Sequence, residues 1–70
     1  MKNARYYLSY LAGFLLENNG EELEDSQLDK LDNAWEGLSQ SEADFCSNLV
    51  ADYIHGFYTL HQLKEIIQSL

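Results

Sequence analysis

The sequence contains no proline and only four glycines among its 70 residues. Proline breaks both helices and sheets, and turn-rich β folds use glycine often, so this scarcity favours a helical chain. Long apolar runs are also missing. The longest, residues 6–16, would extend about 16 Å as a helix, which is about half of the ~30 Å hydrocarbon core of a bilayer. We therefore expect no membrane-spanning segment.

Cysteine occurs once, at Cys46, so no disulfide can form within the chain. The spacing Cys46-x8-His55-x5-His61 matches no zinc pattern. Cys46 falls in an apolar arc and both histidines fall on polar faces, so we expect an inert, buried thiol and solvated imidazoles, with no metal and no cofactor. The N-terminal apolar run is followed by Glu17 rather than by a small-residue cleavage site, which argues against a signal peptide. We expect a cytoplasmic protein.

Positive charge is scarce. Four Lys and Arg stand against twelve Asp and Glu, for a net charge of −8. Such a chain repels phosphate groups, so we expect no direct binding to nucleic acid and none to an anionic membrane surface. The partner that this charge favours is a basic protein surface.

Catalytic motifs are missing as well. The sequence has no glycine-rich phosphate loop, no Gly-x-Ser-x-Gly elbow and no dinucleotide fingerprint. Carboxylates become general acids or bases where a pocket removes one of them from water, whereas most acids here fall on predicted polar faces. A DNA-binding helix-turn-helix is also excluded, because its recognition helix, 42–55, would carry no Lys or Arg. The sequence predicts a protein that is not an enzyme.

Apolar residues recur at the helical period in four segments, 3–17, 26–36, 40–55 and 60–69. They predict an all-α fold, a small compact bundle of three to four helices in one domain that spans 1–70. In segment 3–17 the apolar arc is about 200° wide, against ~100° for a typical surface helix. Such a helix either lies centrally among its neighbours or keeps one side for a partner.

The ends of these segments carry capping signals. Ser39 with Glu42, and Thr59 with Gln62, have the spacing of capping boxes. Further signals are Asn18-Asn19-Gly20 and Gly56, which close helices, and Asp25 or Ser26, either of which can cap segment 26–36.

Helical wheels assign the faces that we expect to be buried. They are Leu28, Leu31, Ala34 and Trp35 in segment 26–36, with Leu38 just after it, and Cys46, Leu49, Val50, Tyr53 and Ile54 in segment 40–55, with Phe57 just after it.

Carboxylates gather on the other side of segment 26–36. Asp25, Asp29, Asp32 and Glu36 fall within an arc of about 60°, and Glu22 precedes them in an acidic connection. Helical residues four apart rise about 6 Å, close to the spacing of phosphates along one strand of nucleic acid. One interpretation is a solvated face that keeps the chain soluble. The other is a partner-binding surface for the Arg and Lys residues of a nucleic-acid-binding protein.

Aromatic residues cluster in segment 3–17, at Tyr6, Tyr7, Tyr10 and Phe14. Core packing is one interpretation. Tyrosine also supplies large, rigid contact area with a polar tip at protein interfaces. The second interpretation is therefore a homodimer face made of Tyr6, Tyr10 and Phe14.

The run LDKLDNAWEGLSQSE, residues 28–42, resembles the phrase Leu-Asp-x-Leu-Asp-x-x-Trp-x-x-Leu-Ser-x-x-Glu of small helical proteins of bacteriophages and their hosts. It covers about a fifth of the chain. The resemblance implies a phage-type protein, and small acidic phage proteins include inhibitors of host defence, such as anti-CRISPR proteins, and DNA mimics. The preferred hypothesis is a non-enzymatic inhibitor that blocks a basic surface of a nucleic-acid-binding protein. The alternative is a structural homo-oligomer that uses the aromatic face.

Overall fold

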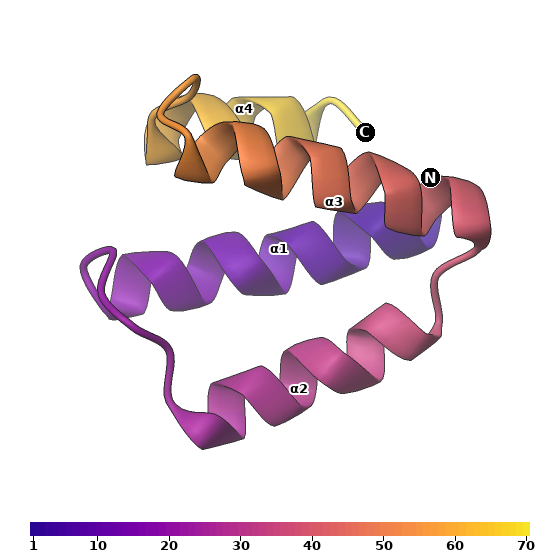
Figure 1. The fold of residues 1–70 in the computed structure, drawn as a ribbon, viewed down its shortest axis with the longest axis horizontal. Helices are drawn as coiled ribbons and strands as arrows, with labels where there is room; N and C mark the ends of the chain where they lie inside the picture. Colours follow the sequence, from indigo (N-terminus) through magenta and orange to yellow (C-terminus); the bar gives the residue numbers. More distant parts are fainter.

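Four helices and no strand form the structure, a computed structural model that describes all 70 residues. The all-α prediction is confirmed, and each helix begins and ends within one residue of its predicted bounds. None of the helices combines the length and the apolar character that a membrane crossing requires. The helices are α1 (Lys2–Glu17), α2 (Asp25–Glu36), α3 (Gln40–Ile54) and α4 (Leu60–Gln68), shown in Figure 1.

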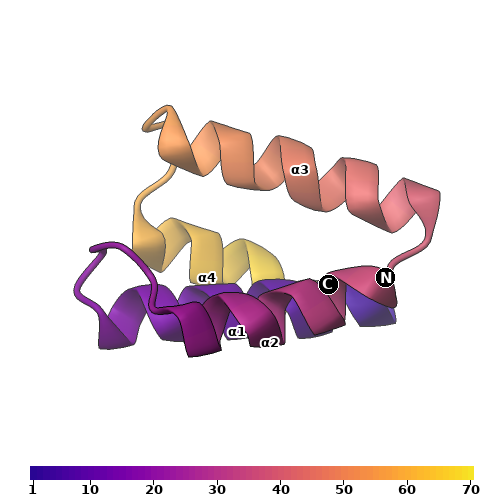
Figure 2. The same cartoon turned by 60° about the horizontal axis from the view of Figure 1, so that its bottom comes forward.

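Helix α1 lies at the centre and packs against each of the other three helices. Figure 1 shows α2 on one side of it and α3 and α4 on the other. In Figure 2, α3 stands well apart from α4 and lies on one side of the layer formed by α4, α1 and α2. The wide apolar arc of α1 explains this arrangement, because three neighbours need three adjoining faces. Of the two predicted positions for this helix, the central one is observed.

The core is small. Nine residues are buried, and Leu8, Leu63 and Cys46 are the largest of those that are fully enclosed. Full burial of a leucine side chain stabilises a fold by about 1.5–3 kcal/mol. Domains of this size have total stabilities of about 5–15 kcal/mol or less, so each of these side chains matters. The remaining buried residues are Ala4, Leu11, Ala12, Leu31, Leu49 and Ile67.

Helices α1 and α3 end in left-handed turns, as predicted. Asn19 and Gly20 adopt φ of 55° and 78°, and the Gly20 N–H donates to the Leu15 carbonyl at 2.7 Å. Gly56 adopts φ of 87° after α3. Asparagine and glycine tolerate this conformation best, which explains why they stand where the chain leaves its helices.

Both predicted capping boxes are confirmed. The Ser39 hydroxyl accepts from the Glu42 N–H at 3.2 Å, and the Thr59 hydroxyl accepts from the Gln62 N–H at 3.1 Å. Each box is reciprocal, since the side chains of Glu42 and Gln62 accept from the backbone N–H of the capping residue. These bonds satisfy N–H groups that have no partner inside the helix.

The predicted cap of α2, Asp25 or Ser26, was wrong. Glu24 is the capping residue, and its backbone N–H donates to Gln27 Oε1 at 2.9 Å. The same Gln27 oxygen accepts from Asn18 Nδ2 at 2.8 Å. This amide pair also joins Gln27 to the end of α1, and the cap lies one residue before the first of the two predicted positions.

The predicted buried face of α2 was also partly wrong. Leu31 is buried, but Leu28 and Trp35 are 44% and 36% exposed. Among its neighbours α2 packs mainly against α1, so only the centre of its apolar stripe is covered. Trp35 packs at the edge of that contact.

The end of α3 departs from prediction for a similar reason. Ile54 and Phe57 are 73% and 72% exposed, although Cys46 and Leu49 on the same stripe are buried. Helix α4 packs on α1 rather than closely on α3, which leaves the last turn of α3 uncovered. Phe57 also follows the left-handed Gly56, so its helical-wheel position does not apply.

Candidate functional site

The acidic ridge, which we define as Asp25, Asp29, Asp32 and Glu36, lies on the surface of α2. All four residues are exposed. Their positions follow the helical period, so they form one strip about 16 Å long on the side of α2 away from the buried Leu31. The structure therefore brings together the four carboxylates that the sequence placed on one arc.

No cation neutralises this strip. The only ion pair in the structure joins His61 and Glu65 on α4, at 3.0 Å. Successive members of the ridge are three or four residues apart, and like charges at that spacing destabilise a helix by about 0.2–0.5 kcal/mol per pair. Folding alone gives no reason for this alignment.

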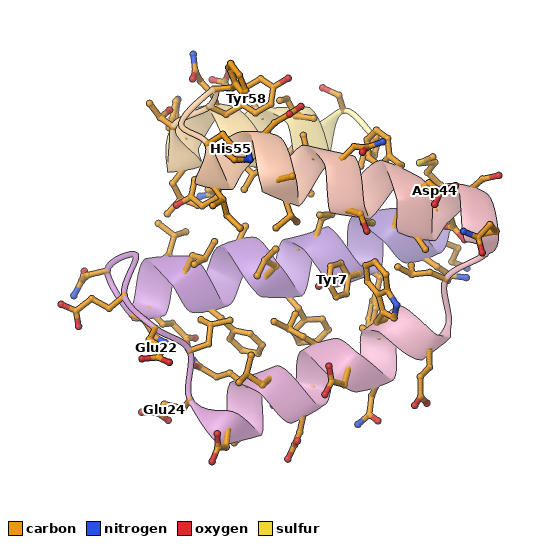
Figure 3. The ribbon with its side chains drawn as sticks, viewed as in Figure 1. Tyr7, Glu22, Glu24, Asp44, His55 and Tyr58 are labelled. Carbon is orange, nitrogen blue, oxygen red and sulfur yellow. The ribbon has the colours of Figure 1, made fainter.

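Glu22 lies outside the helix, in the segment between α1 and α2, where Figure 3 shows it beside Glu24. Its side chain is exposed, and its backbone carbonyl accepts from Asn18 Nδ2 at 3.2 Å. Glu22 precedes the ridge in the chain but does not share its helical line.

Two exposed apolar side chains border the ridge. Leu28 is four residues before Asp32 and Trp35 is three residues after it, so both are its neighbours on the helix surface. Sequence reasoning missed these residues as surface features because their periodicity is that of a buried stripe. No local sequence signal distinguishes an exposed apolar stripe from a buried one, since exposure here depends on how little of α2 is covered by other helices.

The aromatic residues of α1 divide into two groups. Tyr7 is half-buried and packs edge-on against Trp35, with ring centroids 5.2 Å apart. Burial, chiefly, raises the pKa of Tyr7, with smaller contributions from Cys46 and Asp32. Figure 3 shows its ring near α2. For Tyr7 the core interpretation is the better one.

Tyr6, Tyr10 and Phe14 instead form a ladder along the side of α1. The rings of Tyr6 and Tyr10 meet edge to face at 4.9 Å, and those of Tyr10 and Phe14 are 5.8 Å apart. Tyr6 is 56% exposed, while Phe14 packs against the core. The Tyr6 hydroxyl donates to that of Tyr10 at 3.4 Å, and this contact raises the pKa of Tyr6. Tyr6 and Tyr10, the exposed members of the ladder, are thus available to a partner.

The single thiol is enclosed. Cys46 is fully buried, and burial, with the nearby Glu42 charge, raises its pKa above the ordinary value. A raised pKa lowers the thiolate fraction and hence nucleophilicity. His55 and His61 are exposed, as expected, and no three His, Cys, Asp or Glu side chains cluster as metal ligands do.

Known proteins offer no further guide. The chain matches no family model, no curated protein and no solved structure. The resemblance of residues 28–42 to phage-type sequences therefore remains a prediction, and function is proposed from the residues and their geometry.

Proposed function

We propose that this protein is a non-enzymatic binding module whose acidic ridge engages a basic surface of a nucleic-acid-binding protein. One observation carries the proposal: four aligned, exposed carboxylates have no cationic partner within their own chain. Arg and Lys side chains that normally hold phosphates are the natural ligands of such a strip. The phage-type resemblance and the net charge of −8 are consistent with an inhibitor in the style of a DNA mimic or an anti-CRISPR protein.

The ridge supplies orientation and speed of association more than affinity. An exposed ion pair contributes only about 0–1 kcal/mol, whereas complementary fields raise association rates and exclude wrong partners. Arginine forks would add geometric specificity by binding a carboxylate through two N–H groups.

Affinity in this proposal comes from the apolar border of the ridge. Trp35 and Leu28 are exposed beside Asp32, and tryptophan is enriched among the residues that dominate binding energy. A partner that pairs with the ridge would also cover these two side chains. The exposed Trp35 thus gains a role that its predicted place in the core did not give it.

The test is a reversal of the ridge with a matched control. The triple variant Asp29→Lys, Asp32→Lys and Glu36→Lys is compared with Glu21→Lys, Asp44→Lys and Glu65→Lys, which changes the net charge equally at exposed positions elsewhere. Each is used at low salt to capture proteins from lysate of the native cell, after circular dichroism has verified its helicity.

We expect the wild type and the control to retain a common nucleic-acid-binding protein and the ridge variant to lose it. A double-stranded oligonucleotide should release that protein from the wild type, because both compete for the same basic surface. Capture that survives ridge reversal and is insensitive to salt would reject the proposal and leave the ridge as a solvated face.

A second candidate function is a homo-oligomer that uses Tyr6, Tyr10 and Phe14. The observation in its favour is the exposed ladder, since Tyr6 keeps 56% of its surface in water. Light scattering over a dilution series decides: an oligomer dissociates on dilution, whereas a monomer at every concentration eliminates this candidate.

A further inference from the structure

The positive charges of the chain gather on one side of the molecule. Helix α3 lies on one side of the layer formed by α4, α1 and α2 (Figure 2), and the outer side of α1 remains uncovered. Lys2, Arg5 and Ser9 are exposed there. The other two cations border the same side, from α2 and from α4.

Three adjoining hollows show that this is one continuous surface. The two N-terminal cations line a hollow of about 310 Å³ together with Tyr6 and Ser9. Ser9 also lines a hollow of about 280 Å³ between α1 and α4, where Lys64 lies. Tyr6 also lines one of about 280 Å³ between α1 and α2, where Lys30 lies. We call this surface the basic face: Lys2, Arg5, Lys30 and Lys64, with Tyr6, Ser9 and Tyr10 between them.

None of these cations is paired. The chain has twelve acids for four Lys and Arg, yet none of the four lies within ion-pairing distance of a carboxylate. With acids in threefold excess, this separation leaves a basic face and an acidic ridge on one small molecule. Two local fields of opposite sign are the arrangement that steers complementary surfaces together.

We propose that the basic face binds the acidic ridge of a second copy of this chain. The proposal rests on the second candidate function and deepens it by naming what the aromatic side of α1 would contact. Four cations meet four carboxylates. Helix α2 contributes Lys30 to the basic face and all four carboxylates to the ridge, so the two surfaces meet on this helix. In a two-fold dimer the basic face of each copy would contact the ridge of the other, which makes both contacts equivalent.

The aromatic ladder lies where this dimer needs apolar contact. Tyr6 and Tyr10 line the hollow beside Lys30, between the cations of α1 and α2. Charged pairs at the rim contribute little, so the two tyrosines at the centre would contribute most of the binding energy.

An anionic lipid surface is the competing occupant of the basic face, and it fits less well. Such a surface attracts each nearby Lys or Arg by about 1 kcal/mol. It equally repels the ridge, whose Asp29 is next to Lys30 in the chain. A second copy would offer opposite charges to the basic face and to the ridge at the same time. The net charge of −8 on each copy opposes association at long range, but physiological salt screens charges beyond about 8 Å.

In the dimer the ridge is covered, so self-association and capture of a basic target exclude one another. Dilution would then release the surface that binds the target.

The test is a charge swap measured by sedimentation velocity at physiological salt. One variant carries Lys2→Glu and Arg5→Glu, and the other carries Asp29→Lys and Asp32→Lys. Each alone should weaken the dimer by about tenfold or more, because every reversed pair loses an attraction and gains a repulsion. The equimolar mixture should regain the dimer, since both interfaces are then complementary. Asp44→Lys with Glu65→Lys, away from both surfaces, should dimerise like the wild type.

The possible results distinguish an error in the assigned interface from the absence of an oligomer. A dimer that survives Asp29→Lys with Asp32→Lys overturns the ridge assignment while leaving the oligomer in place. A wild type that is monomeric at every concentration overturns both. Monomers that sediment with phosphatidylserine-containing vesicles, and lose this on Lys2→Glu with Arg5→Glu, overturn the inference in favour of a lipid surface.

Discussion

The Glu42 carboxylate links the amino ends of two helices that are far apart in the sequence. Its Oε2 accepts from the backbone N–H of Ala4 at 2.9 Å, across 38 residues. Its Oε1 accepts from the Ser39 N–H at 3.1 Å, which closes the capping box of α3. Helix α1 has no capping side chain of its own, so this carboxylate satisfies one of its free N–H groups. The contact fixes the start of α1 against the turn between α2 and α3 (Figure 1).

Acid should weaken this link. Hydrogen bonds from Ser39 first, and then from Ala4, lower the pKa of Glu42 below the ordinary 4.5. A carboxylate with a lowered folded-state pKa contributes stability that is present above its unfolded pKa and is lost as the pH falls through the folded value. We expect the urea midpoint to fall as the pH drops below about 4.5, the ordinary value.

Glu42→Gln is the comparison for this prediction, because it keeps the shape and an acceptor oxygen but cannot titrate. It should be less stable than wild type at neutral pH and less sensitive to pH below the ordinary Glu range. Asp44→Asn, on the same helix and exposed, is the control. Parallel pH profiles for Glu42→Gln and wild type would show that the link does not couple to protonation.

The core should be sensitive at Leu8. Its side chain is fully buried on α1, and truncation of such a residue costs about 2–5 kcal/mol. Because a 70-residue domain has little stability to spare, Leu8→Ala should leave the chain partly or wholly unfolded at 25 °C. Leu16→Ala, at a 46% exposed position on the same helix, should stay nearer the wild type. Thermal melts followed by circular dichroism compare the two, and equal losses would contradict the packing described.

Two glycine substitutions should have opposite signs. Gly20 adopts φ of 78° after α1, so Gly20→Ala should destabilise the fold by roughly 1 kcal/mol. Gly13 lies inside α1 with no atom within 4 Å of an added Cβ, so Gly13→Ala should stabilise it by about 0.5–1 kcal/mol. Urea unfolding measures both. A Gly13→Ala variant that loses stability would mean that something covers this part of α1, as an oligomer would.

The parts of the fold that could be predicted are those that short-range sequence patterns determine. Periodicity and capping boxes act within a few residues, so the helix bounds, the turns at Gly20 and Gly56 and the alignment of the ridge on α2 follow from sequence. The exposure of Trp35 and Ile54 does not, because it depends on which neighbour covers each helix. The bond between Glu42 and Ala4 is likewise invisible to local reasoning.

The basic face could not be predicted from sequence for the same reason. Lys2 and Arg5 are recognisable in sequence as lying opposite the apolar arc of α1. Lys30 and Lys64 come from two other helices and join them only because α2 and α4 both flank α1. A ridge on one helix can be found by spacing, whereas a face built from three helices needs the packing.

Cys46 should react slowly with thiol reagents in the folded protein. It is fully buried, and its pKa is raised by burial, so little thiolate is present or accessible at neutral pH. We expect alkylation by iodoacetamide to be slow in buffer and rapid in urea, where the thiol titrates normally. Mass spectrometry over time distinguishes the two states. Rapid native alkylation would mean that α3 opens readily from α1.

Removing the ridge charges should stabilise the chain, although it abolishes the proposed binding. Asp29→Asn, Asp32→Asn and Glu36→Gln together relieve three like-charge contacts, each costing about 0.2–0.5 kcal/mol, and barely alter helix propensity. Urea unfolding at low ionic strength should show this gain, and salt should erase it, because exposed charges are screened.

The control for the ridge is Asp44→Asn, which lies on α3 and accepts from Gln40 Nε2 at 3.0 Å. It should bring no such gain, since no ridge repulsion is relieved. A neutralised ridge that proves less stable than wild type would mean that these carboxylates serve the fold. A more stable one would mean that the chain keeps them at the expense of stability, either for binding or for solubility, and the capture experiment with the ridge variant distinguishes these two roles.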